Sequence, residues 1–313
     1  MSSNLRDVAL KLGFVDAQPT TGHPFNVWLS RLKGTHWERL SHIHDPAEVS
    51  GWQTCEITIW TAIAPAPPLA DWPEDCGEIG AYYLSTKANK NRRIAWEDEA
   101  ISMGYEIICD VFLPERAAAI RAGLGVHGLN GLMIAPEHGS FVDISVLLVR
   151  TPPPEDAKGP EHDMSQGCGN CGACIEACPS GAISQNGLNV HTCLRHYMNK
   201  LDELPEANYK NMGRRILGCD VCQHVCPYNA ALKRIQPADE LVDFMKLENL
   251  LTSTDFGSIS EHVQLDETRA KSQAVLAAAN TGRKDLLPLV ERLAKSDDIV
   301  LSKMAQWAVG CLK

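Results

Sequence analysis

The stretch that decides the organisation of this chain begins at residue 168 and reads Cys168-Gly-Asn-Cys171-Gly-Ala-Cys174-Ile-Glu-Ala-Cys178-Pro179. Three cysteines at two-residue gaps are followed by a cysteine that precedes proline. Each iron of a [4Fe–4S] cube needs one thiolate, and one tight loop can supply three of them. In modules with two cubes, the cysteine before proline binds the other cluster. The stretch therefore predicts two clusters.

A second run completes most of the ligand set. It reads Cys219-Asp-Val-Cys222-Gln-His-Val-Cys226-Pro227 and holds only three cysteines, so a further ligand is needed. Cys193 is the one candidate between the two runs. We therefore assign cluster 1 to Cys168, Cys171, Cys174 and Cys226. We assign cluster 2 to Cys178, Cys193, Cys219 and Cys222.

Zinc and disulfides are the competing interpretations of these cysteines. A Cys-x2-Cys pair is common in zinc sites. However, a zinc site does not need a third cysteine at the same gap followed by a Cys-Pro pair, and both runs have this pattern. Residues 1–19 show no apolar signal peptide, so we expect a cytoplasmic protein, whose reducing surroundings favour thiolates over disulfides.

Composition restricts the partners. The 313 residues carry a formal net charge of −10, which argues against a generally basic nucleic-acid binder. Two local groups of basic residues remain, at 87–93 and at 210–234, and each is either a binding patch or a solvated face. No run of 18 apolar residues is present, so we expect no membrane span.

The chain divides into four parts, and we expect an α+β protein. Residues 1–150 carry strand patterns at 54–64, 105–111 and 141–149 and helix patterns at 4–12, 89–103 and 115–122, which predict an N-terminal α/β domain. Residues 151–166 are a proline-rich linker. Residues 167–235 form the two-cluster, bacterial ferredoxin-like module.

Residues 236–313 are expected to be helical. An amphipathic, alanine-rich segment at 268–280 is followed by helix patterns at 286–295 and 300–312, with Gly282 and the Asp297-Asp298 pair at the turns. This arrangement resembles one or two HEAT-type repeats. An ordinary helical hairpin is an equally good interpretation, and either one must bury its apolar face against the rest of the chain.

The order of these parts resembles the epoxyqueuosine reductase family, which shares its chemistry with reductive dehalogenases. The similar stretches are the Glu115-Arg116 pair with Ala122-Gly-Leu-Gly125, the Gly139-Ser140 turn, the cluster runs at 168–183 and 212–229, and the tail at 268–293. The second cluster run with the isolated upstream Cys193 is the most specific of these.

The resemblance implies an oxidoreductase that carries out the last step of queuosine synthesis in tRNA. It implies a base-off cobalamin, held between the N-terminal domain and the cluster module, in addition to two 4Fe–4S clusters. Cobalt would receive electrons from the clusters and carry the difficult step. The implied partners are a tRNA anticodon stem-loop and an external low-potential electron donor, either flavodoxin or ferredoxin.

The family's acid is an aspartate six residues before the Glu-Arg pair. Cys109 stands at that position here, and Asp110 follows it. A shift of one residue on a strand turns the side chain to the opposite face, so Asp110 needs a bulge to point inward. We predict Asp110 as the catalytic proton donor, with Cys109 as an alternative. Otherwise Cys109 is a small buried apolar residue.

Four further positions have an implied role. Met133, Ile144 and Asp220 stand where the family lines the corrin; alternatively, Asp220 caps a turn beside the cluster. Tyr82, expected on a strand with Tyr83, is a second alternative proton donor by analogy with dehalogenases, although strand tyrosines usually only pack.

Two other functions stay open at this point. The acidic net charge and the altered substrate elements favour a cobalamin-dependent reductase of a small molecule, similar to a dehalogenase. The absence of a twin-arginine leader argues against a secreted respiratory dehalogenase. The third hypothesis is a non-catalytic iron–sulfur electron carrier.

Overall fold

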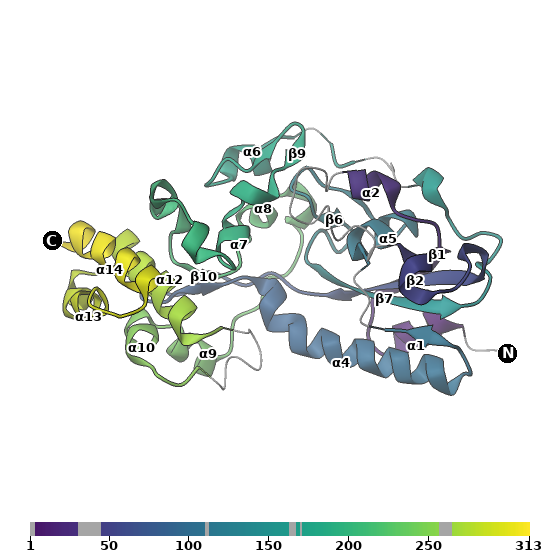
Figure 1. Cartoon of the computed structure of the whole chain (residues 1–313), viewed down its shortest axis with the longest axis horizontal. Helices are drawn as coiled ribbons and strands as arrows, with labels where there is room; N and C mark the ends of the chain where they lie inside the picture. The colour runs from purple at the N-terminus through teal and green to yellow at the C-terminus, as the bar shows by residue number, and fades with distance from the viewer. Residues whose placement is uncertain (1–3, 31–44, 110–112, 163–166, 170, 257–264) are drawn as a thin grey trace. The chain divides into compact units, whose positions relative to one another are not determined.

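The computed structural model describes residues 4–30, 45–109, 113–162, 167–169, 171–256 and 265–313, which form two compact units (Figure 1). The first unit contains residues 1–66 and 88–171, and the second contains residues 67–87 and 172–313. The segment 67–87 is thus N-terminal in sequence but belongs to the second unit. The four-part division expected from the sequence stays a prediction, and the mixed helix-and-strand composition is confirmed.

A four-stranded sheet forms the centre of the first unit, in the order β1-β2-β7-β4. All three of its pairings are antiparallel. Ile59 lies opposite Leu148, and Ile63 lies opposite Ile144. The β-branched residues of β2 favour a strand, and eight of its nine residues are buried, as suits a central position. The strands are β1 (Asp16–Thr21), β2 (Ile57–Pro65), β7 (Val142–Arg150) and β4 (Ile107–Ile108).

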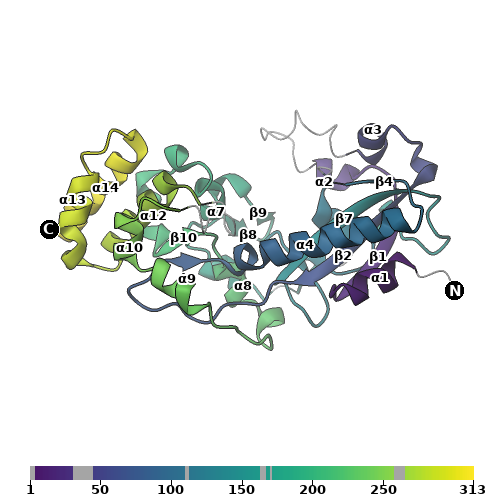
Figure 2. The same ribbon diagram turned by 90° about the horizontal axis from the view of Figure 1, so that it is seen from below.

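Helices cover both faces of this sheet. Figures 1 and 2 both show α4 running alongside it. On one face, Trp60 and Leu147 pack with Trp96 of α4 and Leu5 of α1. On the other face, Ile59 and Leu148 pack with Ala118 of α5. The helices are α1 (Leu5–Lys11), α2 (Asn26–Ser30), α3 (Pro46–Ser50), α4 (Ala81–Ser102) and α5 (Glu115–Arg121).

The largest difference from the sequence prediction concerns α4. The helix was expected over 89–103, but it begins at Ala81, so Tyr82 and Tyr83 lie on its first turn. The prediction that these tyrosines lie on a strand is wrong. The reason is tertiary, because the backbone amide of Ala81 donates to the carboxylate of Asp220 (2.7 Å), which caps the helix from 139 residues away.

Short elements dominate the cysteine-rich part of the second unit. β3 (Glu78–Ile79) pairs in parallel with β10 (Arg215–Leu217). β8 (Ile183–Ser184) and β9 (Gly187–Leu188) form a small antiparallel hairpin. The helices here are α6 (Ala173–Ala177), α7 (Leu194–Tyr197) and α8 (Val221–His224).

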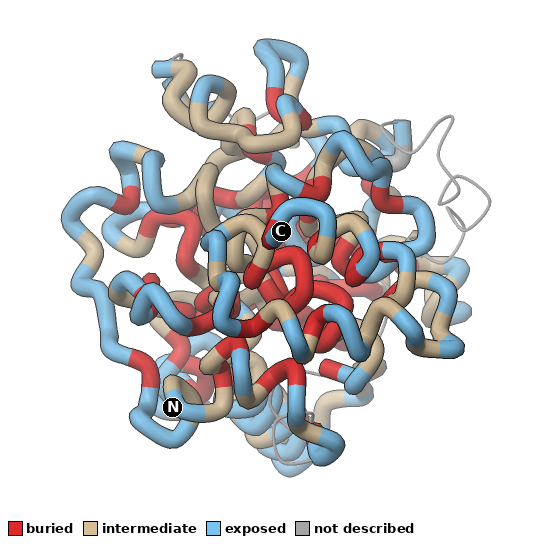
Figure 3. Tube along the Cα trace, turned by 90° about the vertical axis from the view of Figure 1, so that its left-hand side faces the viewer, coloured by how far each residue is buried: buried red, intermediate tan, exposed pale blue. Residues whose placement is uncertain are grey.

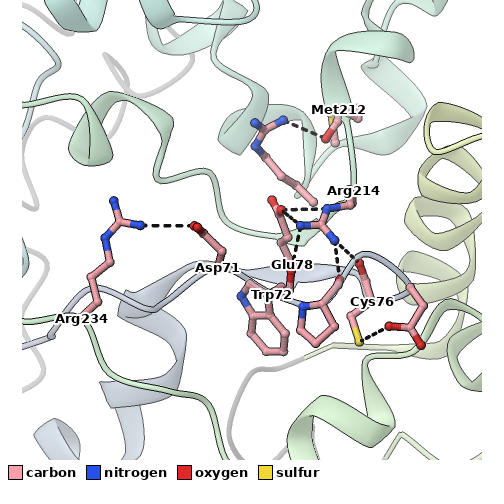
Figure 4. Close-up of polar contacts among 10 residues, drawn as sticks. Asp71, Trp72, Cys76, Glu78, Met212, Arg214 and Arg234 are labelled. Carbon is pink, nitrogen blue, oxygen red and sulfur yellow. Dashed lines mark hydrogen bonds and ion pairs between the residues drawn. The ribbon is translucent and has the colours of Figure 1, made fainter.

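Arg214 fastens the segment 67–87 within the second unit (Figure 4). Its Nε and Nη2 atoms lie 3.0 and 2.8 Å from Oε1 of Glu78. Its remaining N–H groups donate to the carbonyls of Trp72 (3.2 Å), Cys76 (3.4 Å) and Pro73. A guanidinium has five donors and no acceptor, so one arginine can satisfy a whole turn of otherwise unpaired carbonyls.

The tail is helical as predicted, but its first long helix is not amphipathic. All nine residues of α12 from Ala270 to Ala278 are buried, because small side chains let α10 and α14 pack close to it. In Figure 3, several positions of the trace beside the C-terminus are buried. Among the described helices, none is long and apolar enough to cross a membrane. The helices are α9 (Asp239–Phe244), α10 (Leu247–Thr252), α12 (Glu267–Asn280), α13 (Leu287–Leu293) and α14 (Ile299–Leu312).

Candidate iron–sulfur centre

Two short helices carry the cysteine runs. Cys174 lies on α6, and Cys178 follows it. Cys222 lies on α8, with Cys219 before the helix and Cys226 after it. The two helices pack against each other within the second unit. Each run thus has one cysteine within its helix, and the cysteine before proline lies after the end of that helix.

The sulfur of Cys178 is surrounded by backbone amides. The amide of Ala182 donates to it (3.3 Å), and the turn that allows this contains Gly181 with φ of 64°. Burial raises the pKa of the Cys178 thiol, but amides of Ser180, Ala182 and Ile183 outweigh burial, and the pKa lies below its usual value. Amide groups directed at sulfur are the surroundings that a cluster-binding thiolate needs.

Cys193 and Cys219 lie close to this site. Burial raises the pKa of both thiols, and nearby negative charge adds to it, from Cys178 for Cys193 and from Cys193 for Cys219. These three predicted ligands of cluster 2 therefore act on one another, all within the second unit. Buried thiolates that repel each other need a positive partner, and the irons of a cluster supply it.

Cys168 is held by a different element, in the first unit. Its sulfur accepts a hydrogen bond from the amide of Leu129 (3.3 Å), and its own amide donates to the carbonyl of His127 (2.8 Å). Both partners belong to the hairpin formed by β5 (Val126–His127) and β6 (Met133–Ile134). The first cysteine of the run is thus positioned by the N-terminal part of the chain.

The side chains at this site are of the kind that a cube requires. In a [4Fe–4S] cluster, each of four thiolates binds a different iron. In the part of the chain that the structure describes, no three His, Cys, Asp or Glu side chains are grouped like the ligands of one metal ion. A donor set made only of cysteines, with amides directed at sulfur, fits [4Fe–4S] clusters.

Asp220 occupies the position that the sequence offered for either a corrin contact or a turn cap. One carboxylate oxygen accepts from the amide of Ala81 (2.7 Å), and the other accepts from Nε2 of Gln223 (3.1 Å). Burial raises the pKa of Asp220, and these hydrogen bonds oppose the rise. The carboxylate caps α4, and both of its oxygens have partners within the protein.

Met133 and Ile144 lie in the first unit. Met133 is 2% exposed and packs among Ile63, Ile120 and Leu124. Ile144 is half-buried and keeps part of its side chain accessible. Ile144 can therefore contact a ligand through its side chain, whereas the side chain of Met133 is closed off by the core.

The predicted proton donors lie in different surroundings. Asp110 falls outside the described residues. Cys109 is half-buried and packs against the core cluster that contains Trp96. Tyr82 is exposed on the first turn of α4, with its ring edge-on to that of Tyr83 at 5.3 Å between centroids. Which of these donates a proton stays a prediction.

Arg195 and Gly218 were missed by sequence reasoning. The guanidinium carbon of Arg195 lies 5.1 Å from the centre of the Tyr83 ring. A Cβ added at Gly218 would lie 2.9 Å from the same ring. Arg195 follows Cys193 by two residues and Gly218 directly precedes Cys219, so proximity to cluster ligands was the available signal.

Several of the basic residues at 87–93 and 210–234 form hydrogen bonds or ion pairs within the protein. Arg214 binds the segment 67–87, and Arg215 donates to the carbonyls of Asn211 (3.2 Å) and Met212 (3.0 Å). Arg93 pairs with Glu97 on the same helix. The basic groups at 87–93 and 210–234 therefore present less free charge to a polyanion than their composition suggests.

Comparison with known proteins supports the cluster assignment. Residues 167–229 match the family described as the 4Fe-4S double cluster binding domain. This range contains all eight cysteines proposed as ligands. The expectation of an iron–sulfur protein is confirmed.

Curated relatives extend the similarity beyond this module. An epoxyqueuosine reductase of Lactococcus garvieae is 28% identical over 256 residues, which cover 77% of this chain and 70% of the relative. One from Bacillus anthracis is 33% identical over 210 residues, covering 63% and 54%. One from Staphylococcus aureus is 29% identical over 63% of this chain and 53% of that protein. With the last two, the chain aligns over about half the length of the relative.

Solved structures show the same fold. An epoxyqueuosine reductase determined with an epoxyqueuosine-modified tRNA stem loop superposes with a TM-score of 0.81 and 24% identity, over 98% of this chain and 89% of that one. The enzyme from Streptococcus thermophilus gives 0.80 and 23% over the same shares. The resemblance of this chain to the epoxyqueuosine reductase family is therefore confirmed, in sequence and in fold.

Proposed function

We propose that this chain is an iron–sulfur- and cobalamin-dependent oxidoreductase that reduces epoxyqueuosine in tRNA. The observation that carries the proposal is the combination of a double-cluster domain with similarity to epoxyqueuosine reductases over 77% of the chain. One solved relative was crystallised with an epoxyqueuosine-modified stem loop, which supports a tRNA nucleoside as substrate.

The reaction requires two electrons. Converting an epoxide to an alkene breaks two carbon–oxygen bonds, consumes two electrons and two protons, and releases the oxygen as water. A [4Fe–4S] cluster passes one electron at a time, so two transfers are needed for each turnover. An external one-electron donor, flavodoxin or ferredoxin, would supply both electrons through the clusters.

The ligand assignment follows the cysteine pattern. Cluster 1 is bound by Cys168, Cys171, Cys174 and Cys226, and cluster 2 by Cys178, Cys193, Cys219 and Cys222. The mutual charge effects among Cys178, Cys193 and Cys219 support the assignment of cluster 2. The amide of Leu129 stabilises the thiolate of Cys168 in cluster 1.

Cobalamin is the second cofactor that the resemblance implies, and the described residues fit it only in part. Ile144 offers accessible apolar surface to a corrin. Met133 has almost no exposed side chain, and Asp220 has no free carboxylate oxygen. When bound, cobalamin would supply the nucleophilic cobalt for opening the epoxide. We assign no individual step to it.

The protons must come from groups on the protein or from water. Asp110 is the proposed donor, and Cys109 and Tyr82 are the alternatives. Exposure favours Tyr82 over Cys109, since a donor must reach the substrate. The variants Tyr82→Phe, Asp110→Asn and Cys109→Ser test the three candidates separately. The variant that loses turnover identifies the proton donor.

A second function, reduction of a small molecule, is favoured by the charge distribution. The chain carries a net charge of −10, and Arg93, Arg214 and Arg215 are engaged inside the protein. A tRNA-binding surface normally presents several free cations to phosphates. Binding of the anticodon stem-loop, and its loss at raised salt, distinguishes the two functions.

The direct test uses anaerobically reconstituted protein with cobalamin, a reduced flavodoxin, and an anticodon stem-loop that contains epoxyqueuosine. We expect conversion to queuosine, seen by mass spectrometry as the loss of one oxygen. The Cys193→Ala variant and the oxidised donor serve as controls. Absence of conversion by protein that holds both clusters and the corrinoid would contradict the proposal.

A further inference from the structure

We propose that Arg195, held in place by Tyr83, raises the reduction potential of cluster 2. Arg195 is then a tuning residue for electron transfer, and Tyr83 is its positioning residue. The proposal rests on the assignment of cluster 2 to Cys178, Cys193, Cys219 and Cys222. It does not depend on the substrate.

Tyr83 lies close to the cluster-binding loop of the second unit. Its Cε2 atom is 2.9 Å from the position that a Cβ would take at Gly218, the residue before Cys219. The amide of Gly218 donates to the sulfur of Met198 (3.1 Å). Gly218 has φ of 85° and no side chain, so the tyrosine ring can approach the backbone here.

The same ring holds the Arg195 guanidinium. The guanidinium carbon lies 5.1 Å from the ring centre, within the range of a cation–π contact. Burial raises the pKa of the Tyr83 hydroxyl, while the positive charge of Arg195 acts against the rise. The contact with the ring limits the freedom of the long Arg195 side chain.

The charge of Arg195 lies near two predicted ligands of cluster 2. Arg195 follows Cys193 by two residues, and the Tyr83 ring that it contacts approaches the backbone directly before Cys219. Arg215 is a second cation in this loop, and its N–H groups donate to the carbonyls of Asn211 and Met212. Asp220 is a negatively charged residue in the same loop as Cys219. Its two carboxylate oxygens accept hydrogen bonds from the amide of Ala81 and from the side chain of Gln223. Arg195 is half-buried, and its side chain is held in place by the ring of Tyr83.

A fixed cation beside a cluster shifts its potential in one direction. Reduction adds one negative charge to the cluster, and a nearby positive charge stabilises the reduced state more than the oxidised state. Partial burial limits screening by water and salt. The expected effect is that cluster 2 accepts an electron more readily than it would without Arg195.

The test is a redox titration followed by EPR, on anaerobically reconstituted wild-type protein and on R195Q, R195K and Y83L. Loss of one signal in Cys193→Ala identifies cluster 2. In R195Q, the ratio of reduced to oxidised cluster 2 at a fixed potential should fall about tenfold, equivalent to ~59 mV for one electron. R195K keeps the charge and should stay near wild type. Y83L removes the ring but keeps the charge, and should give a smaller fall than R195Q.

Cluster 1 is the internal control and should keep its midpoint in every variant. An unchanged cluster 2 midpoint in R195Q with full iron content would overturn the proposal, as would equal falls in R195K and R195Q. If R195Q does not assemble cluster 2, Y83L decides, because it removes the ring that holds Arg195, and an unchanged cluster 2 midpoint in Y83L would overturn the proposal. Failure to reduce epoxyqueuosine would leave these titrations, and hence this proposal, unaffected.

Discussion

The carboxylate of Asp220 accepts a hydrogen bond from the backbone amide of Ala81 at 2.7 Å, so the residue after Cys219, a predicted cluster ligand, caps the longest described helix. A second hydrogen bond lies next to this contact. The amide of Gly80, which follows β3, donates to the carbonyl of Leu217 at the end of β10 (2.8 Å). The loop that carries Cys219 and the start of α4 therefore form one hydrogen-bonded corner of the second unit.

Asp220→Ala should lower the free energy of unfolding by about 1–2 kcal/mol, because the amide of Ala81 at the start of α4 loses its acceptor. Asp220→Asn keeps an acceptor oxygen and should lose less. Denaturant unfolding of both variants, followed by circular dichroism, measures the difference. Equal losses in the two variants would show that the charge, and not the cap, is what matters.

Cys193→Ala should lose about half of the bound iron, because one of two clusters lacks a ligand. Cys311→Ala is the matched control, since Cys311 is exposed near the end of α14, outside the matched cluster domain. Iron and sulfide analysis after anaerobic reconstitution gives the result. Full iron content in Cys193→Ala would refute the ligand assignment.

Gly218→Ala should destabilise the second unit more than Gly282→Ala. Both glycines have positive φ, 85° and 67°, and alanine there costs roughly 1–2 kcal/mol. At Gly218 the new Cβ would also lie 2.9 Å from the Tyr83 ring and 3.1 Å from the Cα of Gly80, whereas Gly282 has open space. Thermal unfolding measures the decrease in melting temperature for both variants. Equal decreases would argue against the close approach of the Tyr83 ring to Gly218.

Glu115 should make stability depend on pH. Although Glu115 is exposed at the start of α5, the surrounding protein atoms reduce the hydration of its carboxyl and, followed by the negative charge of Asp143, raise its pKa from 4.5 to about 7. The unfolded state loses this proton first, so the free energy of unfolding should fall as pH rises from 4.5 to 7. Glu115→Gln should remove this fall, which denaturant midpoints at pH 5 and pH 8 would reveal.

The Asp143→Asn variant provides the control for that experiment. It removes one cause of the raised Glu115 pKa, so the difference between glutamate and glutamine at 115 should shrink. Glu115 itself is exposed to solvent, which weakens the effect of the Asp143 charge on its pKa. If the free energy of unfolding depends on pH in the same way with glutamate and with glutamine at 115, the dependence arises from other groups.

Gln273→Met should stabilise the protein by about 1–2 kcal/mol. Gln273 is 1% exposed, and neither polar atom of its side chain has a hydrogen-bond partner. Replacing an unsatisfied buried amide with an apolar side chain of similar size removes its desolvation cost. Gln306→Met on the exposed side of α14 should be nearly neutral by comparison. A loss of stability in Gln273→Met would instead indicate a bound water.

Helix and strand positions were predicted well where the signal was local. The helix patterns at 4–12 and 115–122 correspond to α1 and α5, and those in the tail to α12, α13 and α14. The strands at 54–64 and 141–149 correspond to β2 and β7. Each of these segments carries its own apolar periodicity and needs no distant partner to be recognised.

The sequence alone predicted an iron–sulfur protein with two clusters, because thiolate spacing is a property of the covalent chain and matches the corners of a cube. Tertiary structure decided what surrounds those thiolates. Asp220 lies 139 residues from the amide it caps, and Tyr83 lies more than a hundred residues from Arg195. Such pairs leave no periodic trace in the sequence, since they arise only when folding brings separate segments into contact.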